Sequence, residues 1–168
     1  QMTKENSWFL FGPRATGKSY SIRAQLTGKA DYINLLDSKT YLKLKSQPDE
    51  LSSLIKGDLV VIDEVQRVPE LLNEVHLLIE EKNKRFLLTG SSARKLKRGA
   101  GNLLAGRAFK SELYPLTYFE IQKEQEFDLE KYLLTGGLPL AYLGNNSEEF
   151  LYSYVETYLK EEIQAEAL

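Results

Sequence analysis

The sequence predicts an α/β fold, in which helices cover both faces of a mostly parallel central sheet and a small C-terminal helical subdomain follows. Short apolar segments alternate with amphipathic segments along the first part of the chain, as strands and helices do around such a sheet. Several of the apolar segments have no polar interruption, which is typical of strands that are buried on both faces. Beyond Pro115 the composition changes to helix-forming segments.

The apolar segments are expected to form five strands. In chain order these are Trp8–Phe11, Tyr32–Leu36, Leu59–Ile62, Phe86–Thr89 and Ala108–Tyr114. Helices are expected between them at residues 18–26, 39–45, 50–56 and 69–81. In the last of these helices, Leu72, Val75, Leu78 and Ile79 recur at spacings of three and four residues and form one apolar stripe.

The segments 117–124, 128–135 and 148–168 have helical composition. We interpret residues 1–115 as a core domain and residues 116–168 as a helical lid or linker subdomain, although the last helix could equally pack on its own sheet. The chain begins with Gln1 and ends in a helix-forming segment without a stop signal. These ends predict a fragment that is truncated before a further C-terminal domain.

Composition excludes several classes of protein. Of the 168 residues, 42% are apolar and 27% are charged, which excludes a disordered chain. The net charge of −2 provides no general attraction for nucleic acid, although a local basic patch stays open. The absence of cysteine and the single histidine, His76, exclude disulfides, thiol nucleophiles and Cys/His zinc sites. The longest uncharged stretch, 132–147, is broken by glycines and a proline, so we expect no membrane span and a cytoplasmic protein.

The segment from Gly12 to Ser19 has the pattern G-x-x-x-x-G-K-[ST]. It lies between an expected strand and an expected helix, which is the context of a phosphate-binding loop, or Walker A motif. Gly12 and Gly17 allow the backbone to curl around a phosphate. The alternative interpretation of the same segment is a surface turn that contains glycine. The pattern therefore predicts a P-loop NTPase.

Each position of this loop has an expected role. The backbone amides of Thr16, Gly17, Lys18, Ser19 and Tyr20 are expected to bind phosphate oxygens, aided by the positive end of the helix dipole. The Lys18 ammonium is expected to reach the β- and γ-phosphates. The Ser19 hydroxyl is a hard oxygen ligand suited to Mg²⁺.

Two carboxylates, Asp63 and Glu64, follow the apolar segment Leu59–Ile62. Ligands of open α/β sheets bind at the carboxyl ends of the strands, so this pair is expected to form a Walker B motif there. Asp63 is expected to hold Mg²⁺, and Glu64 to orient and polarise the water that attacks the γ-phosphate. On its own, such a pair can equally begin a turn.

The same residues favour ATP over GTP. A water-activating carboxylate directly after the metal-binding Asp is not general among GTPases and small-molecule kinases. The guanine-reading pattern N-K-x-D is also missing, since the stretch 83–86 has Phe86 at the last position.

A third strand end has small hydroxyl side chains in the segment Thr89–Ser92. Ser91 is expected to bind the γ-phosphate or its water, with a turn or helix N-cap as the alternative. Downstream, Arg107 is the first candidate for a catalytic arginine supplied in cis or by a neighbouring subunit, and Arg94 and Arg98 are the second. The alternatives for this basic cluster are a solvated face or a nucleic-acid patch.

These motifs together resemble those of prokaryotic AAA-type ATPases that carry an additional C-terminal domain of poorly known function. The resemblance rests on Gly12–Ser19, Asp63–Pro69, Thr89–Ser92 and Leu104–Arg107, and it extends to Tyr114–Leu116 and Gly136–Pro139. It implies an ATPase core, a strand inserted between the phosphate-loop strand and the Asp63 strand, and Arg107 near the nucleotide. It also implies that an appended domain, often described as nuclease-like, lies outside this chain.

We therefore expect an ATP-binding domain that hydrolyses ATP with Mg²⁺, slowly in isolation, and couples its nucleotide state to an unidentified partner. One alternative is a nucleotide-gated interaction module with little turnover. Another is an ATP-coupled nucleic-acid-binding protein. The expected ligands are ATP and ADP. The expected partner is another protein or the missing C-terminal region, and the chain is also expected to be able to form an oligomer.

Overall fold

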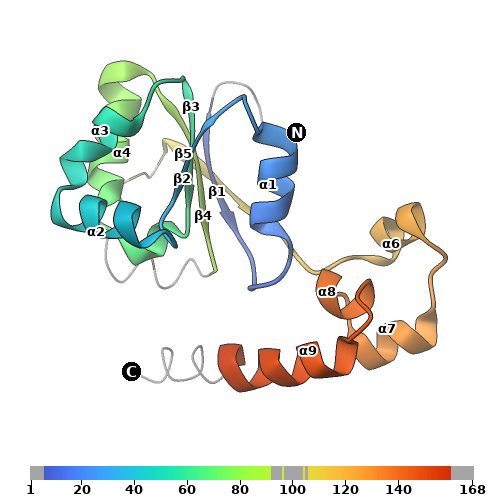
Figure 1. Cartoon of the computed structure of the whole chain (residues 1–168). Helices are drawn as coiled ribbons and strands as arrows, with labels where there is room; N and C mark the ends of the chain where they lie inside the picture. The colour runs from blue at the N-terminus through green and yellow to red at the C-terminus, as the bar shows by residue number, and fades with distance from the viewer. Residues whose placement is uncertain (1–5, 92–95, 97–103, 105, 160–168) are drawn as a thin grey trace. The chain divides into compact units, whose positions relative to one another are not determined.

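A computed structural model of the chain describes residues 6–91, 96, 104 and 106–159 (Figure 1). These residues fall into two compact units. The first comprises the described residues through Gly12 together with those from Lys18 to Leu113. The second comprises Pro13–Gly17 and the described residues from Tyr114 onward.

The first unit contains a five-stranded parallel sheet, which confirms the predicted fold class. Its strands are β1 (Ser7–Phe11), β2 (Asp31–Asn34), β3 (Leu59–Asp63), β4 (Arg85–Gly90) and β5 (Ala108–Glu112). Their spatial order is β2-β3-β4-β1-β5, and every pair is parallel. Strand β4 thus lies between β1 and β3, as the resemblance implied.

Parallel pairing brings the carboxyl ends of three neighbouring strands to one edge of the sheet. Phe11 at the end of β1 pairs with Gly90 at the end of β4. On the other side of β4, Ile62 pairs with Leu88, so that Asp63 lies level with Thr89. The loop after β1 and the acidic pair after β3 therefore leave the sheet at the same edge.

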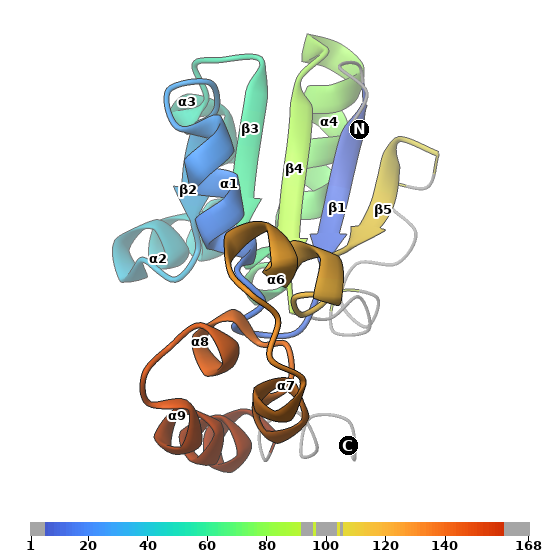
Figure 2. The ribbon, with the colours of Figure 1, turned by 90° about the vertical axis from the view of Figure 1, so that its right-hand side faces the viewer.

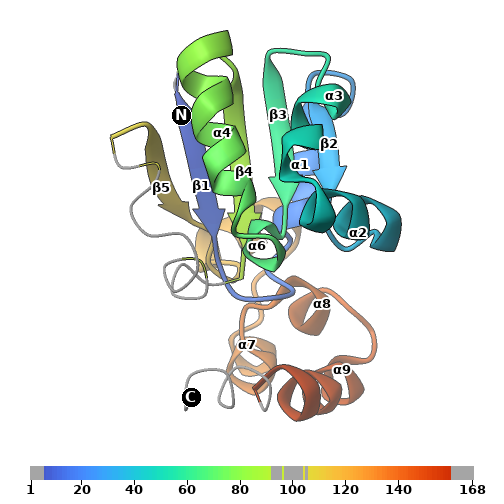
Figure 3. The ribbon, with the colours of Figure 1, turned by 90° about the vertical axis from the view of Figure 1, so that its left-hand side faces the viewer.

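Helices cover both faces of this sheet. Helix α1 (Lys18–Leu26) lies on the face seen in Figure 2, whereas α2 (Ser38–Ser46), α3 (Leu51–Leu54) and α4 (Leu71–Lys82) lie on the face seen in Figure 3. Short 3₁₀ helices at Pro48–Glu50 and Val65–Arg67 precede α3 and α4.

Alternation along the strands builds two separate cores. Within β3, Val60 and Ile62 join the large cluster under α2, α3 and α4, while Val61 joins Ile22 of α1 and Leu87 of β4 in a smaller cluster. Because successive strand residues point to opposite faces, the uninterrupted apolar sequence of β3 reflects a strand buried on both sides.

The second unit is helical apart from its loop residues. It contains α6 (Tyr118–Glu124), α7 (Leu129–Thr135), α8 (Pro139–Tyr142) and α9 (Ser147–Tyr154), which continues as a π-helical turn at Val155–Leu159. Thr117 and Glu120 form a capping box at the start of α6, and Asp128 caps α7. The sequence did not predict α8.

Candidate functional site

The glycine that opens the loop, Gly12, lies against the backbone of Leu113. A Cβ at Gly12 would lie 2.1 Å from the Leu113 carbonyl oxygen, and Leu113 N donates to Phe11 O at 2.8 Å. The glycine is thus required first by packing of the chain after β5. The buried Lys18 side chain donates from Nζ to Gly12 O at 2.6 Å, so its ammonium lies at the end of β1.

The remaining loop residues, Pro13–Gly17, make a compact turn of their own. Thr16 Oγ1 donates to Pro13 O at 2.9 Å. Ala15 and Gly17 both have positive φ, at 61° and 88°. Left-handed residues of this kind reverse the direction of successive amides, which is the backbone geometry of anion-binding loops.

Asp63 is the most enclosed carboxylate among the described residues, with 1% of its surface exposed. Thr89 Oγ1 donates to Asp63 Oδ1 from β4, and Tyr32 OH donates to Asp63 Oδ2 from β2. Burial, followed by this contact with the Asp63 carboxylate, raises the pKa of the Tyr32 phenol. Tyr32 is therefore a hydrogen-bond donor to Asp63 at neutral pH.

Glu64 follows Asp63 in a left-handed conformation, with φ 63° and ψ 44°. This conformation is costly for residues with a side chain, and such backbone strain clusters at functional sites. Glu64 N donates to Thr89 Oγ1 at 3.2 Å, so one hydroxyl binds both members of the acidic pair. The turn also aligns Gln66, whose Nε2 donates to Glu64 Oε2 and, at 3.5 Å, to Ser91 Oγ.

The structure brings most of the predicted site residues to one edge of the sheet. Gly12, Lys18 and Ser19 follow β1, Asp63 and Glu64 close β3, and the buried Ser91 follows β4. Tyr20 is 80% exposed, and its predicted role concerns only its backbone amide.

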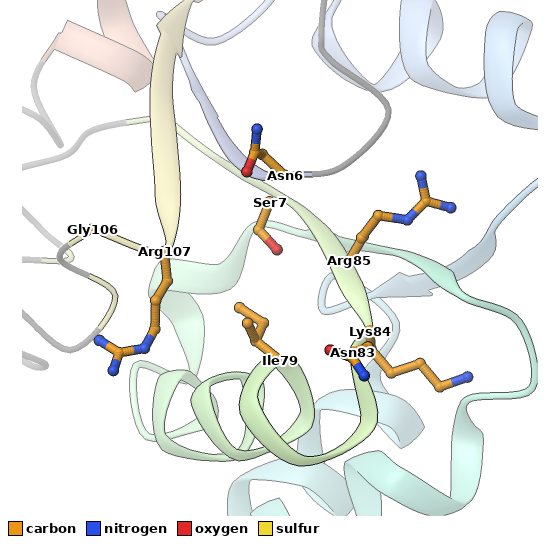
Figure 4. Close-up of a pocket in the computed structure, with 8 residues that line it drawn as sticks. All are labelled: Asn6, Ser7, Ile79, Asn83, Lys84, Arg85, Gly106 and Arg107. Carbon is orange, nitrogen blue, oxygen red and sulfur yellow. The ribbon is translucent and has the colours of Figure 1, made fainter.

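Arg107 lies at the opposite edge of the sheet from the other candidates. It precedes β5, whose first residue Ala108 pairs with Ser7 at the start of β1. There it forms an ion pair with Glu80 and lines a pocket with Lys84 and Arg85 (Figure 4). The strands separate it from Lys18, so the structure does not support the expected position of Arg107 near the nucleotide of its own chain.

The second-choice arginines and the last hydroxyl of the third strand end lie outside the described residues. These are Arg94, Arg98 and Ser92.

Sequence reasoning missed Tyr32, Thr89 and Gln66. Thr89 was recognisable as a hydroxyl at a strand end beside the acidic strand, but Ser91 was preferred. Gln66 follows Glu64 by two residues, and this spacing predicts a contact between their side chains once the tight turn at Glu64 is known. Tyr32 has no such signal, because its contact with Asp63 spans 31 positions.

The site contains few charged ligands. Within the part of the chain that the structure describes, no three His, Asp or Glu side chains are grouped to hold a metal ion. Among the same residues, no helix is both long and apolar enough to cross a membrane.

The fold and this sheet edge define a P-loop α/β domain. Residues 4–122 match a family described as an AAA domain, and the chain belongs to that family.

Curated relatives are longer proteins. An uncharacterized protein of Mycobacterium tuberculosis is 29% identical over 161 residues, which cover 92% of this chain and 35% of the relative. An uncharacterized protein of Methanocaldococcus jannaschii is 29% identical over 133 residues, covering 73% and 29%. The chain thus spans about a third of the length of the relatives it matches.

Solved structures with a similar fold include the following two proteins. The Thermotoga maritima RuvB Holliday junction branch migration motor is 23% identical, with a TM-score of 0.46 over 70% of this chain and 41% of that one. The Aeropyrum pernix ORC1 protein in complex with DNA is 14% identical, with a TM-score of 0.45 over 70% and 42%.

Proposed function

We propose that this chain is the core of an ATPase, which binds ATP with Mg²⁺ and hydrolyses it to ADP and phosphate. The observation that carries the proposal is the position of Asp63 and Glu64 at the sheet edge from which Lys18 and Ser19 emerge. Membership of the AAA domain family supports nucleotide binding.

The phosphate groups of ATP occupy the amides from Thr16 to Tyr20 in this proposal. The Lys18 ammonium, which donates to Gly12 O at the end of β1, contacts the phosphate oxygens when ATP binds. Ser91 senses the γ-phosphate from the end of β4. ATP rather than GTP is the substrate, since the guanine-reading pattern is missing.

The side-chain oxygen atoms of Asp63 and Ser19 are suitable ligands for Mg²⁺. Asp63 accepts one hydrogen bond at each carboxylate oxygen, from Thr89 and Tyr32. A carboxylate offers about four lone-pair sites, so acceptor capacity remains for the ion or its bound water. The Ser19 hydroxyl supplies a second hard oxygen. When bound, Mg²⁺ neutralises charge on the phosphate oxygens.

Glu64 is the proposed base that orients the attacking water. Its carboxylate follows the metal-binding residue directly, and Thr89 and Gln66 fix its backbone and side chain. The partner that responds to the bound nucleotide is another protein segment or a neighbouring copy of the chain. We also infer a cytoplasmic location, because ATP is the proposed substrate.

The test is release of inorganic phosphate from Mg²⁺-ATP by the purified chain. Glu64→Gln is expected to lower turnover by about 10²- to 10⁴-fold while ATP still binds. The matched control is Glu70→Gln, which removes an exposed carboxylate six residues further on. Unchanged turnover in Glu64→Gln would remove Glu64 from the mechanism. A chain that binds ATP but shows no turnover even before mutation would instead favour a nucleotide-gated interaction module.

A further inference from the structure

Gln66 has no role in the motifs that define the site, yet its side chain joins two of their residues. Its Nε2 donates to Glu64 Oε2 and lies 3.5 Å from Ser91 Oγ. These acceptors come from the ends of two neighbouring strands, β3 and β4. Gln66 therefore connects the proposed water-orienting carboxylate with the proposed phosphate-sensing hydroxyl.

Chemistry fixes which way the Gln66 amide points. A carboxylate only accepts hydrogen bonds, so the NH₂ group must face Glu64 and the carbonyl oxygen must point away. That oxygen, Oε1, is buried and accepts no hydrogen bond among the described residues. Since an unpaired buried acceptor costs free energy, packing alone would not select this arrangement. The contact with Glu64 offsets that cost because hydrogen bonds to charged groups are stronger than neutral ones.

Gly90 makes room for this amide. A Cβ at Gly90 would lie 2.5 Å from Gln66 Oε1 and 3.4 Å from its Cδ. Gly90 does not have a positive φ, so a Cβ there would act through this contact, and the end of the Gln66 side chain would have to shift. Gly90 thus leaves space for the Gln66 amide beside its contact with Glu64.

On these observations we propose that Gln66 is a positioning residue, which holds Glu64 by one carboxylate oxygen and links its orientation to Ser91. The inference rests on the proposed ATPase function. The second carboxylate oxygen, Oε1 of Glu64, accepts no hydrogen bond from the residues that the structure describes, and in this proposal it binds the attacking water. The longer contact to Ser91 is the weaker of the two, so a γ-phosphate that binds Ser91 changes the amide environment without releasing Glu64.

Gln66→Met preserves side-chain length and removes the NH₂ donor. We expect kcat for ATP hydrolysis to fall about 10- to 100-fold, a range typical of residues that hydrogen-bond to a functional group and orient it. KM is expected to stay within about twofold of that of the unmodified chain. Gly90→Ala is the second variant, because it displaces the amide while leaving Gln66 and Glu64 in the sequence. The control is Gln122→Met, which removes an exposed glutamine that binds only Tyr118 OH among the described residues. Normal kcat in both Gln66→Met and Gly90→Ala would overturn the proposal.

A readout without turnover separates this inference from the proposed function. The side-chain amide signals of Gln66 in ¹⁵N NMR spectra are identified by their loss in Gln66→Met. We expect Glu64→Gln to shift them strongly, and a non-hydrolysable ATP analogue with Mg²⁺ to shift them where ADP does not. If the chain proves unable to hydrolyse ATP, the ATPase proposal fails and these signals still decide the contact. Amide signals that resemble those of an exposed glutamine and ignore both changes would refute the role of Gln66.

Discussion

Thr89 and Asp63 lie side by side on neighbouring strands, and the Thr89 hydroxyl donates to Asp63 Oδ1. Both residues are fully enclosed, with 0% and 1% of their surfaces exposed. The same hydroxyl accepts from Glu64 N, so a single side chain of β4 organises the acidic pair of β3. The site is thus held by strand pairing as well as by its own motifs.

Thr89→Val keeps the shape of the side chain and removes this hydroxyl. Asp63 Oδ1 then loses a donor and Glu64 N loses an acceptor in a buried place, so the free energy of unfolding is expected to fall by about 1–3 kcal/mol. Chemical denaturation measures the change. Thr27→Val is the control, because the hydroxyl of Thr27 is exposed and bonds locally to Arg23 O. Equal losses in the two variants would contradict the account of Thr89.

Gly12→Ala tests whether the first glycine of the loop is required by packing. The added Cβ would meet the Leu113 carbonyl oxygen at 2.1 Å, a backbone atom that cannot swing aside. We expect a loss of about 1–3 kcal/mol in the free energy of unfolding, as for other overpacked sites. Gly57→Ala provides the comparison, since its Cβ meets its nearest atom at an ordinary 3.5 Å. Comparable stability of the two alanine variants would exclude the steric explanation.

Arg107 lies at the far edge of the sheet from Lys18, so we predict that it acts on a nucleotide bound to another copy of the chain. Arg107→Ala is expected to reduce turnover by about 10³-fold or more. Mixing it with equally inactive Lys18→Ala should restore part of the activity, since each variant supplies what the other lacks. Glu80→Ala controls for loss of the partly exposed ion pair. Mixtures that stay inactive would exclude a contribution between copies.

The capping box of α6 predicts a pH dependence in the helical unit. The backbone amide and then the hydroxyl of Thr117 lower the pKa of Glu120 from its ordinary 4.5. A lowered folded-state pKa means that this stabilisation is complete above pH 4.5 and is lost as the pH falls through the lowered value. The melting temperature of the unmodified chain should therefore drop more between pH 6 and about pH 3 than that of Glu120→Gln. Parallel pH profiles would show that the cap does not titrate.

The sequence was sufficient to predict helices and strands that are specified by neighbouring residues. Helix α1 begins at Lys18 and ends at Leu26 as expected, and strand β3 extends the predicted segment by one residue to Asp63. Helix α8 was missed because glycines and Pro139 suggested only a break, whereas proline is also favoured in the first turn of a helix.

Contacts between strands were not accessible in the same way. Thr89 and Asp63 are 26 positions apart, and Tyr32 and Asp63 are 31 apart, so no periodicity or spacing links them. The position of Arg107 depended on which end of β5 it precedes, and a motif does not specify the edge of the sheet. Local motifs therefore single out candidate residues, whereas the side chains that contact those residues become visible only in the folded structure.

Titration of the purified chain with fluorescent ATP and Mg²⁺ tests the central claim, that the end of β1 binds phosphate beside Asp63 and Glu64. Lys18→Ala is expected to weaken binding by about tenfold or more, which corresponds to about 1.4 kcal/mol, because the ammonium that contacts the phosphates is lost. Lys29→Ala, at an exposed lysine beyond the end of α1, should bind like the unmodified chain. Undiminished binding by Lys18→Ala would contradict the assignment of the site.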